Sequence, residues 1–194
     1  MSSAARNAPP MHETGPFVSL TEWDRDWSRR EETYELLDGH LLMTPSESFA
    51  NADAAAALLL ALRPRLGPRW AVLQHFDVHV GSHGDRHTIR TPDLVVVRRD
   101  AIGRGDRRVN AHHVLLVVEI LSPSTEHTDL REKRAEYATA QIPHYVVIDV
   151  RNQPTVRHLA DPVGGDYRSD VGGPLVTLHL DGHDITIRAD DLVL

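Results

Sequence analysis

Three segments in the middle of the chain are almost wholly apolar, and they constrain the fold more than any other feature. They are DLVVV at 93–97, VLLVVEIL at 114–121 and HYVVIDV at 144–150. Runs of this length and composition predict strands. Because the runs are continuous rather than alternating, both faces of each strand must be buried. The chain therefore requires a central sheet covered on both sides by helices.

One carboxylate, Glu119, interrupts the second apolar run. An isolated ionised carboxylate in a low-dielectric interior costs far more free energy than the neighbouring Val and Leu side chains gain by burial. The Glu119 side chain must therefore be protonated, paired with a buried Lys or Arg, or bound to a metal cation. The run itself leaves these alternatives open.

The remaining elements follow from local signals. Residues 127–141 predict a helix between the second and third runs, so the segment 114–150 predicts a βαβ crossover. A capping box between Ser19 and Glu22 predicts a short helix from Ser19, and the turn Asp38-Gly39 predicts strands at about 34–37 and 40–43. A helix is expected from Ser46 to near Pro64, followed by one strand with a polar face over 70–81. The tail is expected to form short antiparallel strands.

Together these elements predict the α/β class. The expected architecture is a central mixed sheet flanked by helices, preceded by an N-terminal helix and a β-hairpin. A length of 194 residues is suited to one domain, which we place at 17–194. Residues 1–16 contain three prolines and few apolar groups, and we expect them to form a flexible lead-in.

Two acidic residues stand on the most buried strands: Asp93 at the start of the first run and Glu119 deep in the second. Neighbouring strands lie about 4.8 Å apart, so both carboxylates can converge on one ion. Mg²⁺ suits such a site, because it takes oxygen ligands, keeps several waters and often uses only one or two protein carboxylates; Mn²⁺ is the expected substitute. The alternative for Asp93 is that an Asp after a Pro merely ends a turn.

The helix after the second run carries a lysine. The segment TDLREKRAEY places Asp129, Lys133 and Tyr137 on one helical face. A lysine that points back toward a bound metal could orient or help deprotonate a water and stabilise charge on a phosphate. The same spacing is that of an ordinary surface ion pair between Asp129 and Lys133, worth about 0.3–0.5 kcal/mol. Spacing alone does not decide between the two.

Five stretches in this order resemble a known family. They are YELLDGHLLMTPS, TPDLVVV, LLVVEILSPST, DLREKRAEY and IPHYVVIDV. The chain resembles the Uma-two family of restriction-endonuclease-like proteins, within the PD-(D/E)XK nuclease superfamily, over about residues 30 to 160. This resemblance implies that the single domain at 17–194 has a restriction-endonuclease-like core and acts on DNA.

The resemblance also implies roles for individual residues. Asp93 and Glu119 would bind the divalent metal, with the main-chain carbonyl of Ile120 as a further ligand. The superfamily usually carries a lysine two residues after the glutamate, where this chain has Leu121. Lys133, on the next helix, is implied as the replacement.

Two further positions follow from the resemblance. Glu35, in the expected hairpin, matches a position that supplies an additional catalytic carboxylate, although it could equally be an outward-facing strand residue. Asn51 stands where relatives often carry a histidine, which removes one acid, base or phosphate donor. Many relatives act as dimers, so a homodimer is also expected.

Composition limits the other possibilities. A formal charge of −7 argues against a protein that coats nucleic acid nonspecifically. Local contact is still open, because RRDAIGRGDRR is either a phosphate-contacting or a solvated loop. Its arginines are Arg98, Arg99, Arg104, Arg107 and Arg108.

Other sites and locations are excluded by what the chain lacks. The absence of cysteine excludes disulfides and thiolate metal sites, and no glycine-rich motif predicts a nucleotide cofactor. No apolar run is long enough for a membrane span and no signal peptide is evident, so we expect a cytoplasmic protein without a membrane partner.

The leading hypothesis is a metal-dependent endonuclease, a hydrolase that cleaves phosphodiester bonds in DNA with Mg²⁺ or Mn²⁺. The alternative is a catalytically inactive DNA-binding or protein-interaction module on the same fold. Asn51 and the acidic charge balance favour the alternative.

Overall fold

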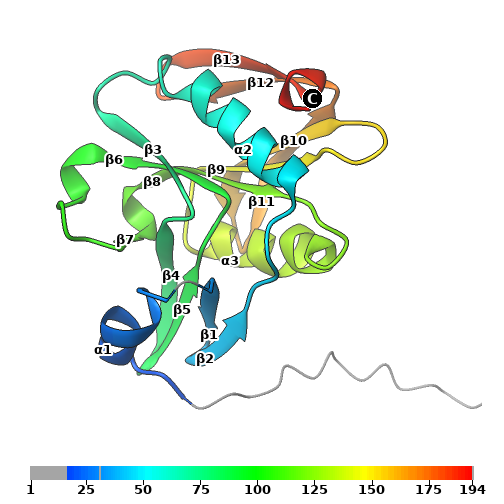
Figure 1. Cartoon of the computed structure of the whole chain (residues 1–194). Helices are drawn as coiled ribbons and strands as arrows, with labels where there is room; N and C mark the ends of the chain where they lie inside the picture. The colour runs from blue at the N-terminus through cyan, green and yellow to red at the C-terminus, as the bar shows by residue number, and fades with distance from the viewer. Residues whose placement is uncertain (1–16, 31, 194) are drawn as a thin grey trace, which may run out of the picture.

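A computed structural model describes residues 17–30 and 32–193 of the chain, and Figure 1 shows how their elements are arranged. The flexible lead-in expected at residues 1–16 lies outside the described residues. The helical segments are α1 (Leu20–Glu22), η1 (Trp23–Trp27), α2 (Phe49–Leu62), η2 (Arg99–Ala101), η3 (Ala111–His113), η4 (Thr128–Lys133), α3 (Arg134–Thr139) and η5 (Ala189–Leu192). In the described part of the chain, no helix is long and apolar enough to cross a bilayer.

The largest sheet has six strands in the spatial order β11-β10-β9-β8-β6-β3. Strands β8 and β9 are parallel and the other neighbours are antiparallel, so the sheet is mixed and the predicted βαβ crossover is confirmed. The strands are β3 (Trp70–Gln74), β6 (Leu94–Arg98), β8 (Val114–Ile120), β9 (His144–Asp149), β10 (Thr155–Val163) and β11 (Asp166–Gly173).

A second sheet has five strands in the order β2-β1-β5-β4-β7, and β12 pairs with β13 in a separate hairpin. Its strands are β1 (Tyr34–Leu37), β2 (His40–Met43), β4 (Asp77–His83), β5 (Arg86–Arg90) and β7 (Arg108–Asn110), and the hairpin consists of β12 (Leu175–Leu180) and β13 (His183–Arg188). The N-terminal helix and the β1–β2 hairpin are therefore present, as predicted.

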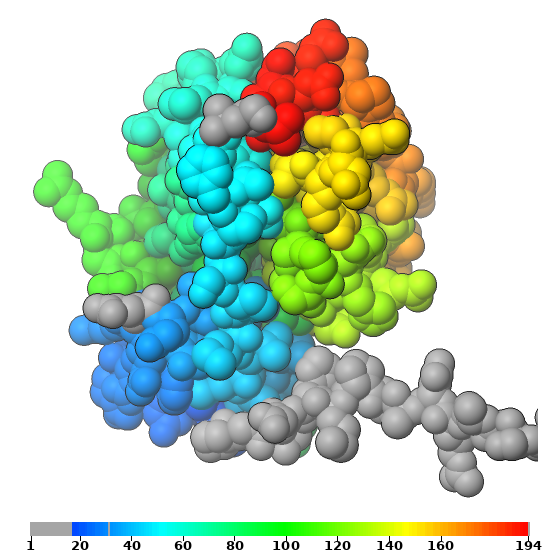
Figure 2. All heavy atoms as spheres, turned by 45° about the vertical axis from the view of Figure 1, so that its right-hand side comes forward, coloured from blue at the N-terminus to red at the C-terminus, as the bar shows by residue number. Residues whose placement is uncertain are grey.

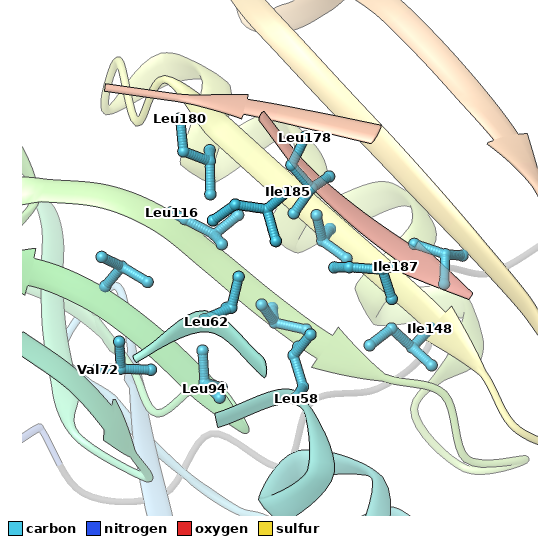
Figure 3. Close-up of a cluster of buried hydrophobic side chains, with 14 of the residues drawn as sticks. Leu58, Leu62, Val72, Leu94, Leu116, Ile148, Leu178, Leu180, Ile185 and Ile187 are labelled. Carbon is cyan, nitrogen blue, oxygen red and sulfur yellow. The ribbon is translucent and has the colours of Figure 1, made fainter. Parts of the chain in front are cut away.

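The central sheet is buried on both faces, which explains the continuous apolar runs. In β6, Leu94 and Val96 pack in the core that contains α2, whereas Val95 and Val97 pack in the core that contains α3. Figure 3 shows the first of these cores, where side chains of α2 and of the β12–β13 hairpin meet those of the sheet. Helices thus flank the sheet on either side, in agreement with the predicted fold class.

One predicted element is wrong. Residues 70–81 form two strands rather than one: β3 belongs to the central sheet and β4 to the second sheet. His75, between them, adopts a positive φ of 47°, which turns the chain out of the first sheet. The alternating pattern of the sequence continues across this break, so it did not reveal the turn. Asp77, expected on an exposed polar face, is buried.

The tight turn of the β1–β2 hairpin provides a stability test. Asp38 and Gly39 have φ angles of 49° and 83°, as the predicted turn requires. A Cβ atom on Gly39 would lie 2.6 Å from Cε2 of the Phe17 ring. We expect Gly39→Ala to lower the free energy of unfolding by about 1–2 kcal/mol from the left-handed backbone alone, and by more from the ring contact.

Gly84→Ala is the matched control in a urea titration of both variants. Gly84 also has a positive φ, of 60°, but no atom lies within 4 Å of its added Cβ. The difference between the variants therefore reports the contact with Phe17. Equal losses of stability in both would show that the ring moves aside without cost.

Candidate active site

A pocket of about 560 Å³ lies where the β1–β2 hairpin, the start of α2 and the η4 segment meet. Figure 2 shows these parts of the chain side by side on one face, in blue, cyan and yellow-green. The ends of the two central strands that carry Asp93 and Glu119 also reach its wall. The pocket thus collects segments that are far apart in the sequence.

The two predicted metal carboxylates face the same side of the sheet. In the antiparallel β6–β8 pair Leu94 lies opposite Val118, so one step further Asp93 comes opposite Glu119. Both follow the alternation of Val95 and point toward the face covered by α3. The main-chain N–H of Ile120 donates a hydrogen bond of 2.5 Å to Asp93 Oδ2.

Lys133 reaches the same place from the following helix. Its Nζ lies 3.0 Å from Glu119 Oε1, 3.2 Å from Asp129 Oδ1 and 3.3 Å from Glu35 Oε1. The side chains of Lys133 and Asp129 are only 7% and 2% exposed, so the surface ion-pair interpretation is wrong. Lys133 is also the only lysine in the chain.

The structure resolves how Glu119 is accommodated in its apolar strand. Its Oε1 atom accepts a hydrogen bond of 2.7 Å from the Tyr137 hydroxyl and faces the Lys133 ammonium group. Burial raises the pKa of Glu119 well above its usual value, although Lys133 acts in the opposite direction. Burial also raises the pKa of Asp93 to about 6 and the pKa of Asp129.

Glu35 differs from the other carboxylates of the pocket. Its Oε1 accepts a hydrogen bond from the Thr91 N–H and lies near Lys133, and its Oε2 accepts one from Arg90. Burial would raise the pKa of Glu35, but Lys133 and Arg90 outweigh it and lower this pKa. Glu35 is therefore not an outward-facing strand residue; it is buried beside the lysine.

Asn51 is close to the predicted carbonyl ligand. Its side-chain Nδ2 donates a hydrogen bond of 3.1 Å to the carbonyl oxygen of Ile120, and its Oδ1 accepts one from the Ser48 hydroxyl. Both Asn51 and Ile120 line the pocket. Asn51 therefore holds the main chain of Ile120 in place at the end of β8.

The donor set of the pocket fits a hard divalent cation. Within the described residues, Asp93 Oδ1 and Glu119 Oε2 accept no hydrogen bond, because the contacts above use the other oxygen of each carboxylate. Asp129 Oδ1 is a buried oxygen that likewise receives no hydrogen bond, although Lys133 is near. Bare oxygens in an acidic pocket are the ligands that Mg²⁺ and Mn²⁺ prefer.

This site is not a cage built by protein side chains. Over residues 17–30 and 32–193, no group of three or more His, Cys, Asp or Glu side chains is arranged to hold a metal ion. Two carboxylates, one carbonyl and several waters are nevertheless enough for Mg²⁺, which keeps much of its hydration shell in proteins.

The five arginines of the predicted DNA-binding loop lie elsewhere. None of them is among the residues that line the carboxylate pocket. In Figure 1 the loop between β6 and β7 lies on the side opposite η4 and α3. Four of the arginines bind groups of the protein itself. Arg98 and Arg108 form ion pairs with Asp100 and Asp24, and Arg99 and Arg107 donate to main-chain carbonyls of Pro68, Trp70 and Ser28. Arg104 is exposed.

Sequence reasoning missed one residue beside the site, Arg90. This arginine is fully buried and contacts Glu35 and Glu136. Most arginines in proteins are exposed, so the pattern around residue 90 carried no signal of burial.

A signal for Lys133 was available, since a chain with 21 basic residues contains one lysine only.

Comparisons with known proteins give a family and a fold for this chain. Residues 19–185 match the Uma2 family model, described as "Putative restriction endonuclease". Among solved structures, the chain is similar to a protein from Anabaena variabilis ATCC 29413 described as a "putative nuclease belonging to DUF820". The TM-score is 0.68 at 15% identity, with 90% of this chain and 97% of that chain covered.

The structural likeness confirms the predicted nuclease-like fold, and at this identity it shows the fold alone. No curated protein matches the chain significantly. The family match extends over far more than half of the 194 residues, and the protein therefore belongs to the Uma2 family of restriction-endonuclease-like proteins.

Proposed function

We propose that the protein is a metal-dependent endonuclease that hydrolyses phosphodiester bonds in DNA with Mg²⁺ or Mn²⁺. The observation that carries this proposal is the convergence of Asp93, Glu119 and Lys133 in one pocket. Asp93 directly precedes β6, Glu119 lies on β8, and Lys133 is the last residue of η4. Membership of the Uma2 family supports the same reaction class.

The carboxylates of Asp93 and Glu119 and the carbonyl of Ile120 would hold the cation. When bound, such an ion supplies Lewis-acid stabilisation and lowers the pKa of water. The chain prepares this arrangement before an ion arrives: Tyr137 fixes one oxygen of Glu119, and Asn51 fixes the carbonyl of Ile120. Donor atoms that are already fixed in place need less ordering when an ion binds.

Lys133 would serve as a cation rather than as a base. Burial alone would lower the pKa of Lys133, but Glu119, Glu35 and Asp129 outweigh burial and raise it. The amine therefore stays protonated at neutral pH. A buried ammonium beside Glu119 can orient the attacking water and stabilise negative charge on the phosphate, which is the usual electrostatic contribution in phosphoryl transfer.

Contact between the arginine loop and DNA stays a prediction, as does assembly into a homodimer. None of the five arginines lines the pocket, so a DNA held at the pocket would have to extend beyond it to contact the loop. Light scattering of the purified protein checks the oligomeric state.

A catalytically inactive DNA-binding or interaction module is the second candidate. The observation that favours it is the acidic wall of the pocket, which includes Glu32 and Glu47 in addition to the carboxylates above. Acidic side chains repel phosphates unless cations intervene.

Nicking of supercoiled plasmid separates the two candidates. We expect wild-type protein to convert supercoiled plasmid into open-circular DNA with Mg²⁺ or Mn²⁺ and to stop when a chelator is added. Binding of the plasmid in a mobility-shift assay without any nicking, over a range of ion concentrations and pH, would favour the inactive module instead.

A further inference from the structure

Arg90 is a buried cation that lies behind the pocket wall. Its side chain is 0% exposed, and it is not among the residues that line the pocket. The guanidinium group donates from Nη1 to Glu35 Oε2 at 2.8 Å. It also donates from Nε and Nη2 to the two oxygens of Glu136, at 2.7 Å each. A fully buried guanidinium group cannot touch a substrate, so any role in the reaction must pass through its partners.

The two partners of Arg90 come from different layers of the fold. Glu35 lies on β1 of the five-stranded sheet, whereas Glu136 lies on α3. Glu136 follows Lys133 by three residues, which makes the two side chains neighbours on the helix surface. Arg90 therefore ties the helical turn that carries the lysine to the strand that carries one of the lysine's carboxylate partners.

The same contacts give each oxygen of Glu35 its own positively charged partner. Glu35 receives Arg90 on one oxygen and the Thr91 N–H and Lys133 on the other. Arg90 thus neutralises much of the charge of Glu35, so that the ammonium group is not held by Glu35 alone. Lys133 Nζ lies 3.0 Å from Glu119 Oε1, and this contact places it beside the expected metal ligands.

We propose that Arg90 is a positioning residue that holds the Lys133 ammonium group at Glu119 by clamping Glu35 and Glu136. The planar fork of an arginine can bind both oxygens of one carboxylate and still reach a second carboxylate, whereas a lysine cannot do this. The purpose of the clamp rests on the proposed function, in which Lys133 stabilises charge during phosphodiester cleavage. The clamp itself is a property of the resting protein.

The single lysine makes the clamp directly observable. Protein labelled with ¹⁵N-lysine gives one side-chain ammonium resonance, from Lys133. In Glu136→Gln, which removes the charge that Arg90 grips on the helix, we expect hydrogen exchange of this ammonium group to be about tenfold faster. Arg90→Lys is expected to do at least as much, and if that variant does not fold, Glu136→Gln decides alone.

Arg134→Gln is the matched control on the same helix. The Arg134 side chain is 21% exposed, similar to the 24% of Glu136, and it pairs with Asp166 and Asp170 on β11 rather than with the pocket. We expect the ammonium resonance and its exchange rate to be unchanged in this variant. Unchanged exchange in Glu136→Gln, or equal acceleration in Arg134→Gln, would overturn the proposal.

The nicking assay adds a second readout. In Glu136→Gln the turnover number should fall about tenfold with KM unchanged, while Mg²⁺ raises the melting temperature as much as in wild type, because Arg90 does not contact Asp93 or Glu119. If Glu136→Gln lowers both the turnover number and the Mg²⁺-induced rise in melting temperature, the positioning role is overturned. If wild-type protein does not nick DNA, the proposed function fails, yet the ammonium exchange still tests the clamp.

Discussion

Asparagine in place of Asp93 is expected to lower the rate of metal-dependent plasmid nicking by about 10²-fold or more, because it removes one of two carboxylates available to the ion. The substitution keeps the shape of the side chain. The amide oxygen can still accept the hydrogen bond from the Ile120 N–H, while the amide nitrogen replaces the free oxygen and presents N–H groups to the metal position. The variant should therefore fold normally and lose the reaction.

The metal-free Asp93→Asn variant should be more stable than wild type at neutral pH. Burial raises the pKa of Asp93 from 3.8 to about 6, so between these two pH values the folded state holds a proton that the unfolded state releases. Above pH 6 the ionised Asp93 carboxylate destabilises the folded state, and we expect asparagine to raise the free energy of unfolding by about 1–3 kcal/mol. This gain should shrink as the pH falls below 6 and should disappear below 3.8, where Asp93 is protonated in both states.

Thermal unfolding with and without metal completes this test. For an ion at ten times its Kd, the wild type should gain about 1.4 kcal/mol, or about 3–6 °C in melting temperature for a chain of this size. Asp93→Asn should gain much less. Asp100→Asn, at an exposed position paired with Arg98, is the matched control and should retain both nicking and the shift. Nicking by Asp93→Asn at the wild-type rate would identify a contaminant or a site elsewhere.

The second large effect is on folding. Lys133→Met is expected to lower the free energy of unfolding by about 3–5 kcal/mol at pH 7.5, because it leaves buried carboxylates without their ammonium partner. The carboxylates concerned are Glu119, Asp129 and Glu35. Methionine has a similar length and adds no polar group, so the loss reports the charge and not a cavity.

The pH dependence of this loss has a definite sign. Burial raises the pKa of Glu119 and the pKa of Asp129 already in the wild type, and removal of Lys133 raises both pKa values further. The folded variant then takes up protons that the unfolded chain does not hold, so the destabilisation should shrink as the pH falls from 7.5 to 5.

Urea titrations at both pH values measure the loss. Arg134→Met is the control, since it breaks partly exposed ion pairs on the same helix and should cost about 0–1 kcal/mol at either pH. A cost below 1 kcal/mol for Lys133→Met at pH 7.5 would show that the pocket carboxylates do not depend on the lysine for their burial.

Local sequence determined a large part of the fold. The Asp38-Gly39 pair requires positive φ at two successive residues, so the strands at 34–37 and 40–43 were predictable with their bounds. Continuous apolar runs predicted three central strands, because only strands buried on both faces tolerate such runs. The break at His75 was not predictable, since the alternation of side chains persists while the backbone leaves one sheet for another.

The site was predictable only in part. Asp93 and Glu119 stood out because a charge on an apolar strand needs an explanation, and neighbouring strands then bring them together by regular geometry. Lys133 could be assigned no partner from spacing, which is the same for a surface pair with Asp129 and for a buried cluster. The sequence contains a single lysine, which is a signal in itself, but its meaning is clear only once the structure places Lys133 in the pocket.

The amino-acid sequence by itself determined the three central strands, the β1–β2 hairpin and the need to cover the central sheet on both faces, because those features depend on turn chemistry and on the free energy of apolar burial. Only the tertiary structure decided that Glu119 pairs with Lys133 and Tyr137, and that Arg90 joins Glu35 to Glu136. The physical reason is that a buried charge is stabilised by partners from distant parts of the chain, whose meeting depends on how the layers pack.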